Sequence, residues 1–339
     1  MRIIWCFSCL LFFCSFHPTH DNLKEYYRLI YQAEGNLCYE DYGAAVANYC
    51  AAFKKRTPFY ADLRNAFKTA LLSKDSIKVE YIWDLIKKEP DLVNDLKNNV
   101  RVLNLCPTTI KSRISAYTRQ RKKTAFDLIM DSIRAVDQQV RKECPNNLNA
   151  DCKERFYRTD SANIKFIASL LGRTSYSETI QGEKSLQACF LVAWHARRWG
   201  FTDLDNVLYA YIKNGRVKPS ILAQLIEYRS DIDSVNKKYL DGQPDLGFGA
   251  TSIVINNHLL EMNQSDSLIE VVNSNRKRYY LDSLEKDIPK NVLLLQNTLF
   301  KGCSGDLNLE LFRQNMPEED YKVFLSDLTQ KGAVKKLWF

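Results

Sequence analysis

Apolar residues recur at helical spacing through most of this 339-residue chain. The clearest case is the segment 59–72, where six apolar residues fall on one face of a helix at i, i+4, i+7 and i+8 spacing. They are Phe59, Leu63, Ala66, Phe67, Ala70 and Leu71. A long apolar stripe in 124–143 and the apolar run 185–199 predict two further helices, and 249–257 is the best short strand candidate. We therefore expect a mainly α protein with little strand.

The first twenty residues have a different pattern. Arg2 is followed by an apolar run from Ile3 to Cys14 and then by a short polar exit. A charged start followed by roughly 7–15 apolar residues is typical of a secretory signal peptide, and such a run is shorter than the roughly 20 residues of a membrane-spanning helix. No later stretch approaches that length. We expect an exported chain, periplasmic or extracellular, with no transmembrane span.

The residue pattern after position 20 divides the chain into parts. Residues 42–53 (YGAAVANYCAAF) and 59–72 share small residues at close-packing positions and a repeated Ala-x-x-x-Phe/Tyr pattern. In this they resemble tetratricopeptide-type helical repeats, and the resemblance implies a module that binds a protein partner and rarely does chemistry. An ordinary helical hairpin domain is the alternative. The expected parts are a signal peptide (1–20), a tetratricopeptide-like module (21–105), a linker (106–123), a helical domain (124–287) and a C-terminal extension (288–339).

Composition and charge exclude several classes of protein. Apolar residues make up 45% and aromatic residues 12% of the chain, which argues for a globular protein. The net charge of +8 falls to +7 when residues 1–20 are removed, since Arg2 is the only charged residue among them. The densest basic run, RQRKK at 119–123, carries no aromatic stacking pattern, so we expect no nucleic-acid partner.

Cysteines bear on both membrane attachment and redox state. Lipidation of Cys14 is an alternative to plain export that would anchor the protein to a membrane, although the residues before it are bulkier than such a site usually takes. Export permits disulfides. Cys144 and Cys152 enclose the polar segment PNNLNAD and are the best disulfide candidates, whereas Cys38 and Cys50 are either a bridge between neighbouring helices or core residues. No C-x-x-C pair follows residue 20, so we expect no metal site of the zinc-ribbon type.

Polar residues in 124–287 follow a distinctive order. Asp137 precedes Arg141 by one helical turn, Asp160 precedes Asn163, and the pair His195-Ala196 lies in the most apolar helix. Further along come Arg229, the Gly-rich loop 242–251 and the basic run 276–278. This order resembles a bacterial family known only as a domain of unknown function, over roughly half of the chain that remains after export.

The resemblance implies a ligand-binding site and brings no activity with it. The residues that it assigns to this site are Arg229, Gln243, Gly247 and Thr251. The chain departs from the family at Tyr228, where the family has an acid, and in the loop, where Gly-Phe-Gly-Ala-Thr replaces Tyr-Gly-Thr-Gln. These departures put ligand binding by the loop in doubt, and a flexible turn is the alternative interpretation.

The candidate catalytic residues are His195, Asp160, Asn163 and Asp137. A histidine that faces a pocket acts as acid, base or ligand, and a structural core histidine is the alternative. Asp160 and Asn163 are either an N-terminal helix cap or two groups that point at the same pocket as His195. No G-x-S-x-G, phosphate-loop or dinucleotide sequence occurs, and no paired-histidine metal motif, so we expect no cofactor and no metal.

These observations favour an exported, non-catalytic protein that binds a protein partner or a ligand. The alternative is a cell-envelope hydrolase that uses His195 with Asp160 or Asp137, since active sites often draw such residues from separate helices. A structural lipoprotein anchored through Cys14 is a third hypothesis.

Overall fold

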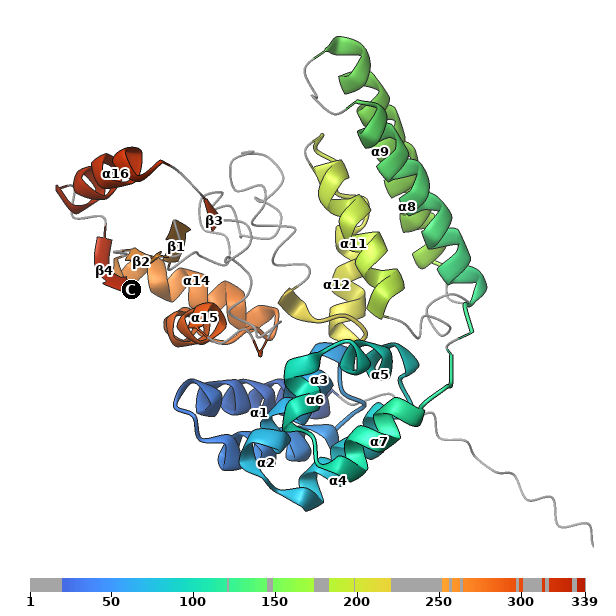
Figure 1. Ribbon diagram of the computed structural model, residues 1–339. Coiled ribbons are helices and arrows are strands. Elements are labelled where there is room, and N and C mark those ends of the chain that lie inside the picture. The colour runs from blue at the N-terminus through green and yellow to red at the C-terminus, as the bar shows by residue number, and fades with distance from the viewer. Residues whose placement is uncertain are drawn as a thin grey trace, which may run out of the picture.

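The computed structural model describes most of the chain after residue 19 (Figure 1). The described ranges are 20–120, 122–144, 149–173, 183–197, 199–220, 252–255, 258–262, 265–296, 299–300, 313–314, 317–330 and 334–338. The expected signal peptide, apart from its last residue, and the expected anchor Cys14 lie outside them. The prediction of a mainly α protein is confirmed. Among the described residues, no helix combines the length and the apolar character that crossing a bilayer requires.

Seven helices form the N-terminal part, the blue-to-teal lobe at the bottom of Figure 1. They are α1 (His20–Cys38), α2 (Tyr42–Phe53), α3 (Tyr60–Ser73), α4 (Ser76–Ile86), α5 (Pro90–Lys97), α6 (Val100–Leu105) and α7 (Thr108–Ala116). The side chains of Asp41, Asp75 and Asn99 cap α2, α4 and α6 by accepting hydrogen bonds from backbone N–H groups. Each of the first four helices packs against the next, so the apolar stripes read from the sequence meet in one core.

The segment 106–123, expected as a linker, contains a packed helix. Ile110 and Ile114 on α7 are buried in the core of the N-terminal part. Cys106 and Tyr117 are only partly buried against this core, and the many basic residues of the segment are typical of a connection. The described chain between α7 and the next helix is therefore much shorter than expected.

A long antiparallel hairpin and a third helix follow, drawn in green and yellow in Figure 1. They are α8 (Ala125–Glu143), α9 (Ala150–Leu171) and α11 (Glu183–Arg197), and each packs against the other two. Thr124 and Asp127 form a capping box at the start of α8. Cys144 and Cys152 are joined by a disulfide at the turn of the hairpin. The polar residues after Cys144 indicate a loop as far as residue 158, but Asn149 caps α9 and the helix begins at Ala150.

The C-terminal part combines helices with a small sheet. Its elements are α12 (Asp205–Lys213), β1 (Ser252–Ile255), β2 (His258–Met262), α14 (Asp266–Arg278), the 3-10 helix η2 (Leu284–Lys286), α15 (Asp287–Gln296), β3 (Arg313–Gln314), α16 (Glu318–Gln330) and β4 (Val334–Trp338). The strand order is β3-β1-β2-β4, with β1–β2 and β2–β4 antiparallel and β1–β3 parallel. The strand predicted over 249–257 contains β1, whereas the tail, expected to be helical, supplies two of the four strands.

The C-terminal part also docks on the first helix of the chain. α15 packs against α1, and the Tyr31 hydroxyl donates a hydrogen bond to the backbone oxygen of Tyr280. Lys218 forms an ion pair with Asp62 at 2.7 Å, and Tyr26 donates to the same carboxylate at 2.6 Å. Segments far apart in the sequence are thus held together by buried polar contacts.

Candidate functional site

Three of the four candidate catalytic residues meet between α8, α9 and α11. The Nδ1 atom of His195 lies 3.1 Å from Oδ1 and 3.0 Å from Oδ2 of Asp137. Arg141 connects both residues to Asp160: its guanidinium donates to His195 Nδ1 at 2.9 Å, to Asp137 at 3.1 Å and to Asp160 at 2.6 Å. Trp199 donates its indole N–H to the other Asp160 oxygen at 2.7 Å. We call these five residues the histidine cluster.

Two members of the histidine cluster were not among the catalytic candidates. Arg141 lies one turn after Asp137, and this i, i+4 spacing of opposite charges was the available signal. Trp199 had no comparable signal, since an aromatic residue at the end of an apolar helix is usually core. Both donate hydrogen bonds to the carboxylate of Asp160, which has no exposed surface and so depends on partners within the protein.

Burial and charge act in opposite directions on the two carboxyl groups. Burial raises the pKa of Asp137, but its hydrogen bond with His195 and the charges of His195 and Arg141 outweigh burial and lower the pKa. The pKa of Asp160 is raised, because its burial exceeds the favourable effects of Arg141 and Trp199. The cluster therefore holds a firmly ionised Asp137 beside a less readily ionised Asp160.

The histidine cluster permits two proton arrangements. If Nδ1 of His195 carries a proton, it donates to Asp137 and Nε2 is left as a base; if Nδ1 is bare, it accepts from Arg141 and Nε2 carries the proton. Only the first arrangement prepares a general base. The side chains of His195, Asp137 and Asp160 do not suit a metal ion, because the Arg141 guanidinium already donates a hydrogen bond to each of them. No metal-binding group of three or more such side chains occurs in the described ranges.

The fourth catalytic candidate, Asn163, makes no hydrogen bond to the histidine cluster. Asn163 lies in the middle of α9, so its interpretation with Asp160 as a helix cap is wrong. Its buried amide nitrogen has no hydrogen-bond partner among the described residues. The expected ligand-binding residues Arg229, Gln243, Gly247 and Thr251 lie outside the described residues.

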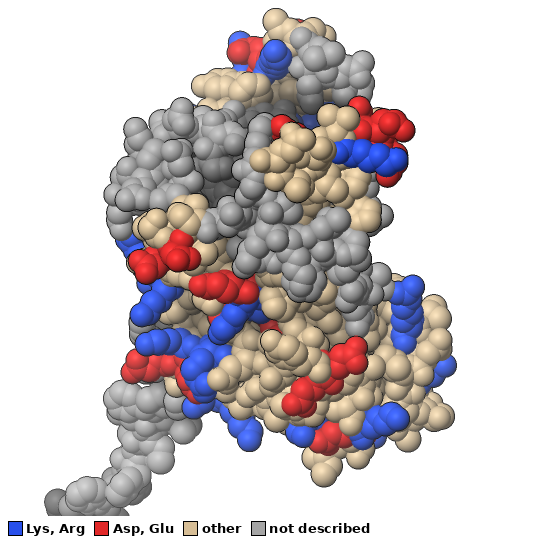
Figure 2. All heavy atoms as spheres, turned by 90° about the vertical axis from the view of Figure 1, so that its left-hand side faces the viewer, with Lys and Arg blue, Asp and Glu red and all other residues tan. Residues whose placement is uncertain are grey.

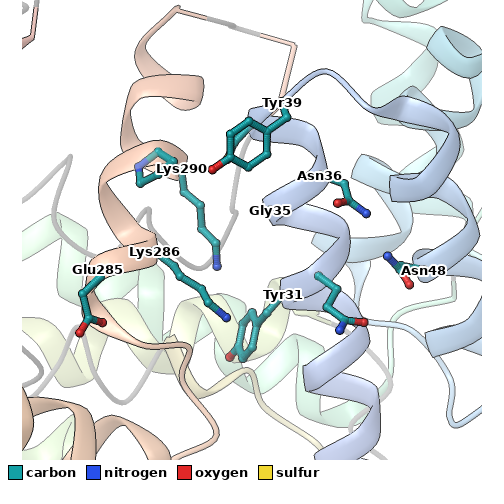
Figure 3. A pocket seen from close by; sticks show the side chains of 11 residues that line it. Tyr31, Gly35, Asn36, Tyr39, Asn48, Glu285, Lys286 and Lys290 are labelled. Atoms are coloured by element: carbon teal, nitrogen blue, oxygen red, sulfur yellow. The ribbon is translucent and has the colours of Figure 1, made fainter.

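A second candidate site is a pocket of about 540 Å³ between α1, α2, η2 and α15 (Figure 3). α1 contributes Tyr31, Gln32, Gly35, Asn36, Cys38 and Tyr39 to its lining. Asn48 of α2, Glu285 and Lys286 of η2, and Pro289 and Lys290 of α15 complete it. Sequence reasoning missed this pocket because its walls are about 250 residues apart. A glycine inside α1 was the one local signal.

Charged groups on the α15 side of the pocket are paired. Lys290, 1% exposed, lies 3.0 Å from both Glu34 and Asp282, and the exposed Lys286 also lies 3.0 Å from Asp282. Burial lowers the pKa of Lys290, but Glu34, Asp282 and Asp287 outweigh burial and raise it. Burial raises the pKa of Asp282, yet the two lysines hold it below its usual range.

The α1 and α2 side carries uncharged polar groups. The carboxamides of Gln32, Asn36 and Asn48 make no side-chain hydrogen bond within the described part of the chain. Between them, a Cβ atom added to Gly35 would meet nothing within 4 Å. Figure 3 shows Asn36 and Asn48 on one side of the pocket and Glu285 and Lys286 on the other. On the molecular face in Figure 2, acidic and basic side chains of the described residues are interspersed.

Comparison with known proteins finds no matching family model, no matching curated protein and no matching solved structure. The resemblances to tetratricopeptide repeats and to the domain of unknown function therefore stay predictions.

Proposed function

We propose that the protein is an exported, non-catalytic binding protein that holds a small ligand in the pocket between α1 and α15. The observation that carries the proposal is the open space over Gly35, surrounded by carboxamides that have no partner in the described ranges. A glycine inside a helix destabilises it by about 0.5–1 kcal/mol relative to alanine. Since no packing contact requires a glycine here, a ligand that approaches the helix backbone closely is a direct reason for it.

Small organic probes test this proposal. We would record amide NMR spectra of the full chain with acetamide, glycerol, acetate or methylammonium, and follow the Gly35 backbone amide and the Asn36 and Asn48 side-chain amides. At least one probe should shift these signals more than those of the exposed Asn94. Gly35→Leu should fill the pocket and abolish the shifts, whereas Gly43→Leu, at the exposed helix glycine of α2, should retain them. Shifts no larger at the pocket than at Asn94 would refute the proposal.

A protein partner is the other form of this proposal, and it uses the same helices. Tyr39, 81% exposed, stands at the edge of the pocket where α1 ends.

The mass of the mature N-terminus tests the export part of the proposal. Cleavage near residue 20 supports a secreted form, a lipid-modified Cys14 supports a membrane anchor, and an intact N-terminus contradicts both.

A hydrolase that uses His195 with Asp137 or Asp160 is the second candidate, favoured by the convergence of these residues from three helices. A catalytic base requires the proton on Nδ1, facing Asp137, with Nε2 bare. Long-range ¹H–¹⁵N NMR spectra report which ring nitrogen is protonated. A proton on Nε2 at neutral pH, alone or together with one on Nδ1, would remove the hydrolase hypothesis.

A further inference from the structure

We infer that the pocket between α1 and α15 takes a neutral, hydroxyl-rich ligand, a short oligosaccharide. The inference rests on the proposed binding function and adds the ligand class. Three features carry it: the pairing of the charged lining groups, the chemistry of the carboxamides, and the kind of apolar surface in the pocket.

The charged lining groups have partners within the protein. Lys290 pairs with Glu34 and Asp282, and Lys286 pairs with Asp282. Both carboxylate oxygens of Glu285 accept hydrogen bonds from the Asn273 amide, at 3.0 and 3.1 Å. An anionic ligand would compete with Asp282 for Lys286, and a cationic ligand would compete with Asn273 for Glu285, so the pocket favours a ligand without net charge.

The carboxamides offer what a polyol needs. Each has two N–H donors and an acceptor oxygen, and a hydroxyl group is likewise both donor and acceptor. Gln32 and Asn36 are one turn apart on α1, about 6 Å along the helix axis, and Asn48 faces the pocket from α2. Neighbouring hydroxyls of one sugar unit can pair with a single carboxamide, and the next unit can reach the next turn of the helix.

The apolar part of the lining distinguishes a saccharide from a peptide. Peptide-binding sites combine main-chain hydrogen bonds with pockets for alternate side chains. No Leu, Ile, Val, Met or Phe lines this pocket among the described residues, and its aromatic side chains are Tyr31 and Tyr39. Tyr31 stacks on Tyr27 and has the Lys290 ammonium over its ring, so Tyr39 is the ring that is open to a ligand. Tyr39 is 81% exposed at the rim, and such a ring offers a flat face to the C–H face of a sugar. Open space above Gly35 leaves room for a sugar ring against the helix backbone.

Titration of the full chain with three neutral trisaccharides tests the inference. Maltotriose, cellotriose and triacetylchitotriose are added at millimolar concentration, with tetra-alanine as the peptide probe, while the Gly35 amide is followed by NMR. At least one trisaccharide should bind with saturation, and tetra-alanine should not. Asn36→Ala should weaken that binding by about twofold to tenfold for each hydrogen bond that is lost. The matched control Asn94→Ala, at the exposed asparagine of α5, should leave it unchanged.

The outcomes separate this inference from the function on which it rests. Binding of tetra-alanine without any trisaccharide would overturn the saccharide assignment and leave the binding function standing. The assignment also fails if the small probes shift the pocket signals and no trisaccharide does. If neither the small probes nor the trisaccharides reach the pocket, the proposed function falls with it.

Discussion

Two lysines on one side of the pocket provide a test of how burial sets the strength of an ion pair. Lys290 and Lys286 both lie 3.0 Å from the Asp282 carboxylate, but Lys290 is 1% exposed and the Lys286 side chain 62% exposed. Lys290→Met leaves Glu34 without its cation in a buried site. Removing one partner of a buried ion pair costs about 3–5 kcal/mol. Lys286→Met removes a solvent-screened pair worth about 0.2–1 kcal/mol.

Urea unfolding of both variants and the wild type measures the difference. We expect the Lys290→Met free energy of unfolding to fall by several kcal/mol and that of Lys286→Met to stay close to the wild type. The loss in Lys290→Met should shrink as the pH falls from 7 to 4. The lysines hold the pKa of Asp282 low in the wild type, and without Lys290 this pKa rises, so the variant gains stability as Asp282 takes up a proton. Equal losses in the two variants would refute the reasoning from burial.

Three further predictions concern stability. Gly35→Ala should raise the free energy of unfolding by about 0.5–1 kcal/mol, because alanine favours the helix and its Cβ meets nothing; a decrease in urea unfolding would contradict this. Burial raises the pKa of Asp287 to about 6, so the folded state binds its proton more tightly than the unfolded state, and stability should rise as the pH falls from 7 to 4. Relative to Asp287→Asn, the wild type should gain up to about 3 kcal/mol over this range; parallel pH profiles would disprove it. Replacing both Cys144 and Cys152 by serine should cost about 2–3 kcal/mol through lost loop closure, and an unchanged urea midpoint would contradict the disulfide.

Helices with a continuous apolar stripe could be predicted from the sequence, and the start of α9 could not. The stripes in 59–72 and 124–143 match α3 and α8 closely. In the first turns of α9, only Cys152 and Phe156 face inward among charged neighbours, and the next inward position is the buried Asp160. A buried carboxylate in place of an apolar residue breaks the pattern on which helix prediction depends.

Three residues of the histidine cluster could be predicted from local patterns in the sequence, and the pocket could not. His195, Asp137 and Asp160 stand out as polar residues on inward faces, and the structure brings them together. The pocket depends on α1 meeting α15, and no local spacing indicates which distant helix will cover which face. The sheet was missed for the same reason, since β2 pairs with β4 across more than 70 residues.

The docking of α15 on α1 has a consequence for the order of events during synthesis. The hydrogen bond between Tyr31 and Tyr280 joins residues 249 positions apart. The ion pair between Glu34 and Lys290 spans a similar length of chain. A ribosome adds about 5–20 residues per second, so α1 leaves it tens of seconds before its partners exist. Until then Glu34 must stay hydrated or find a substitute cation. A nascent chain stopped before residue 280 would therefore lack the contacts between α1 and α15. The N-terminal part would reach its final stability only when translation is nearly over.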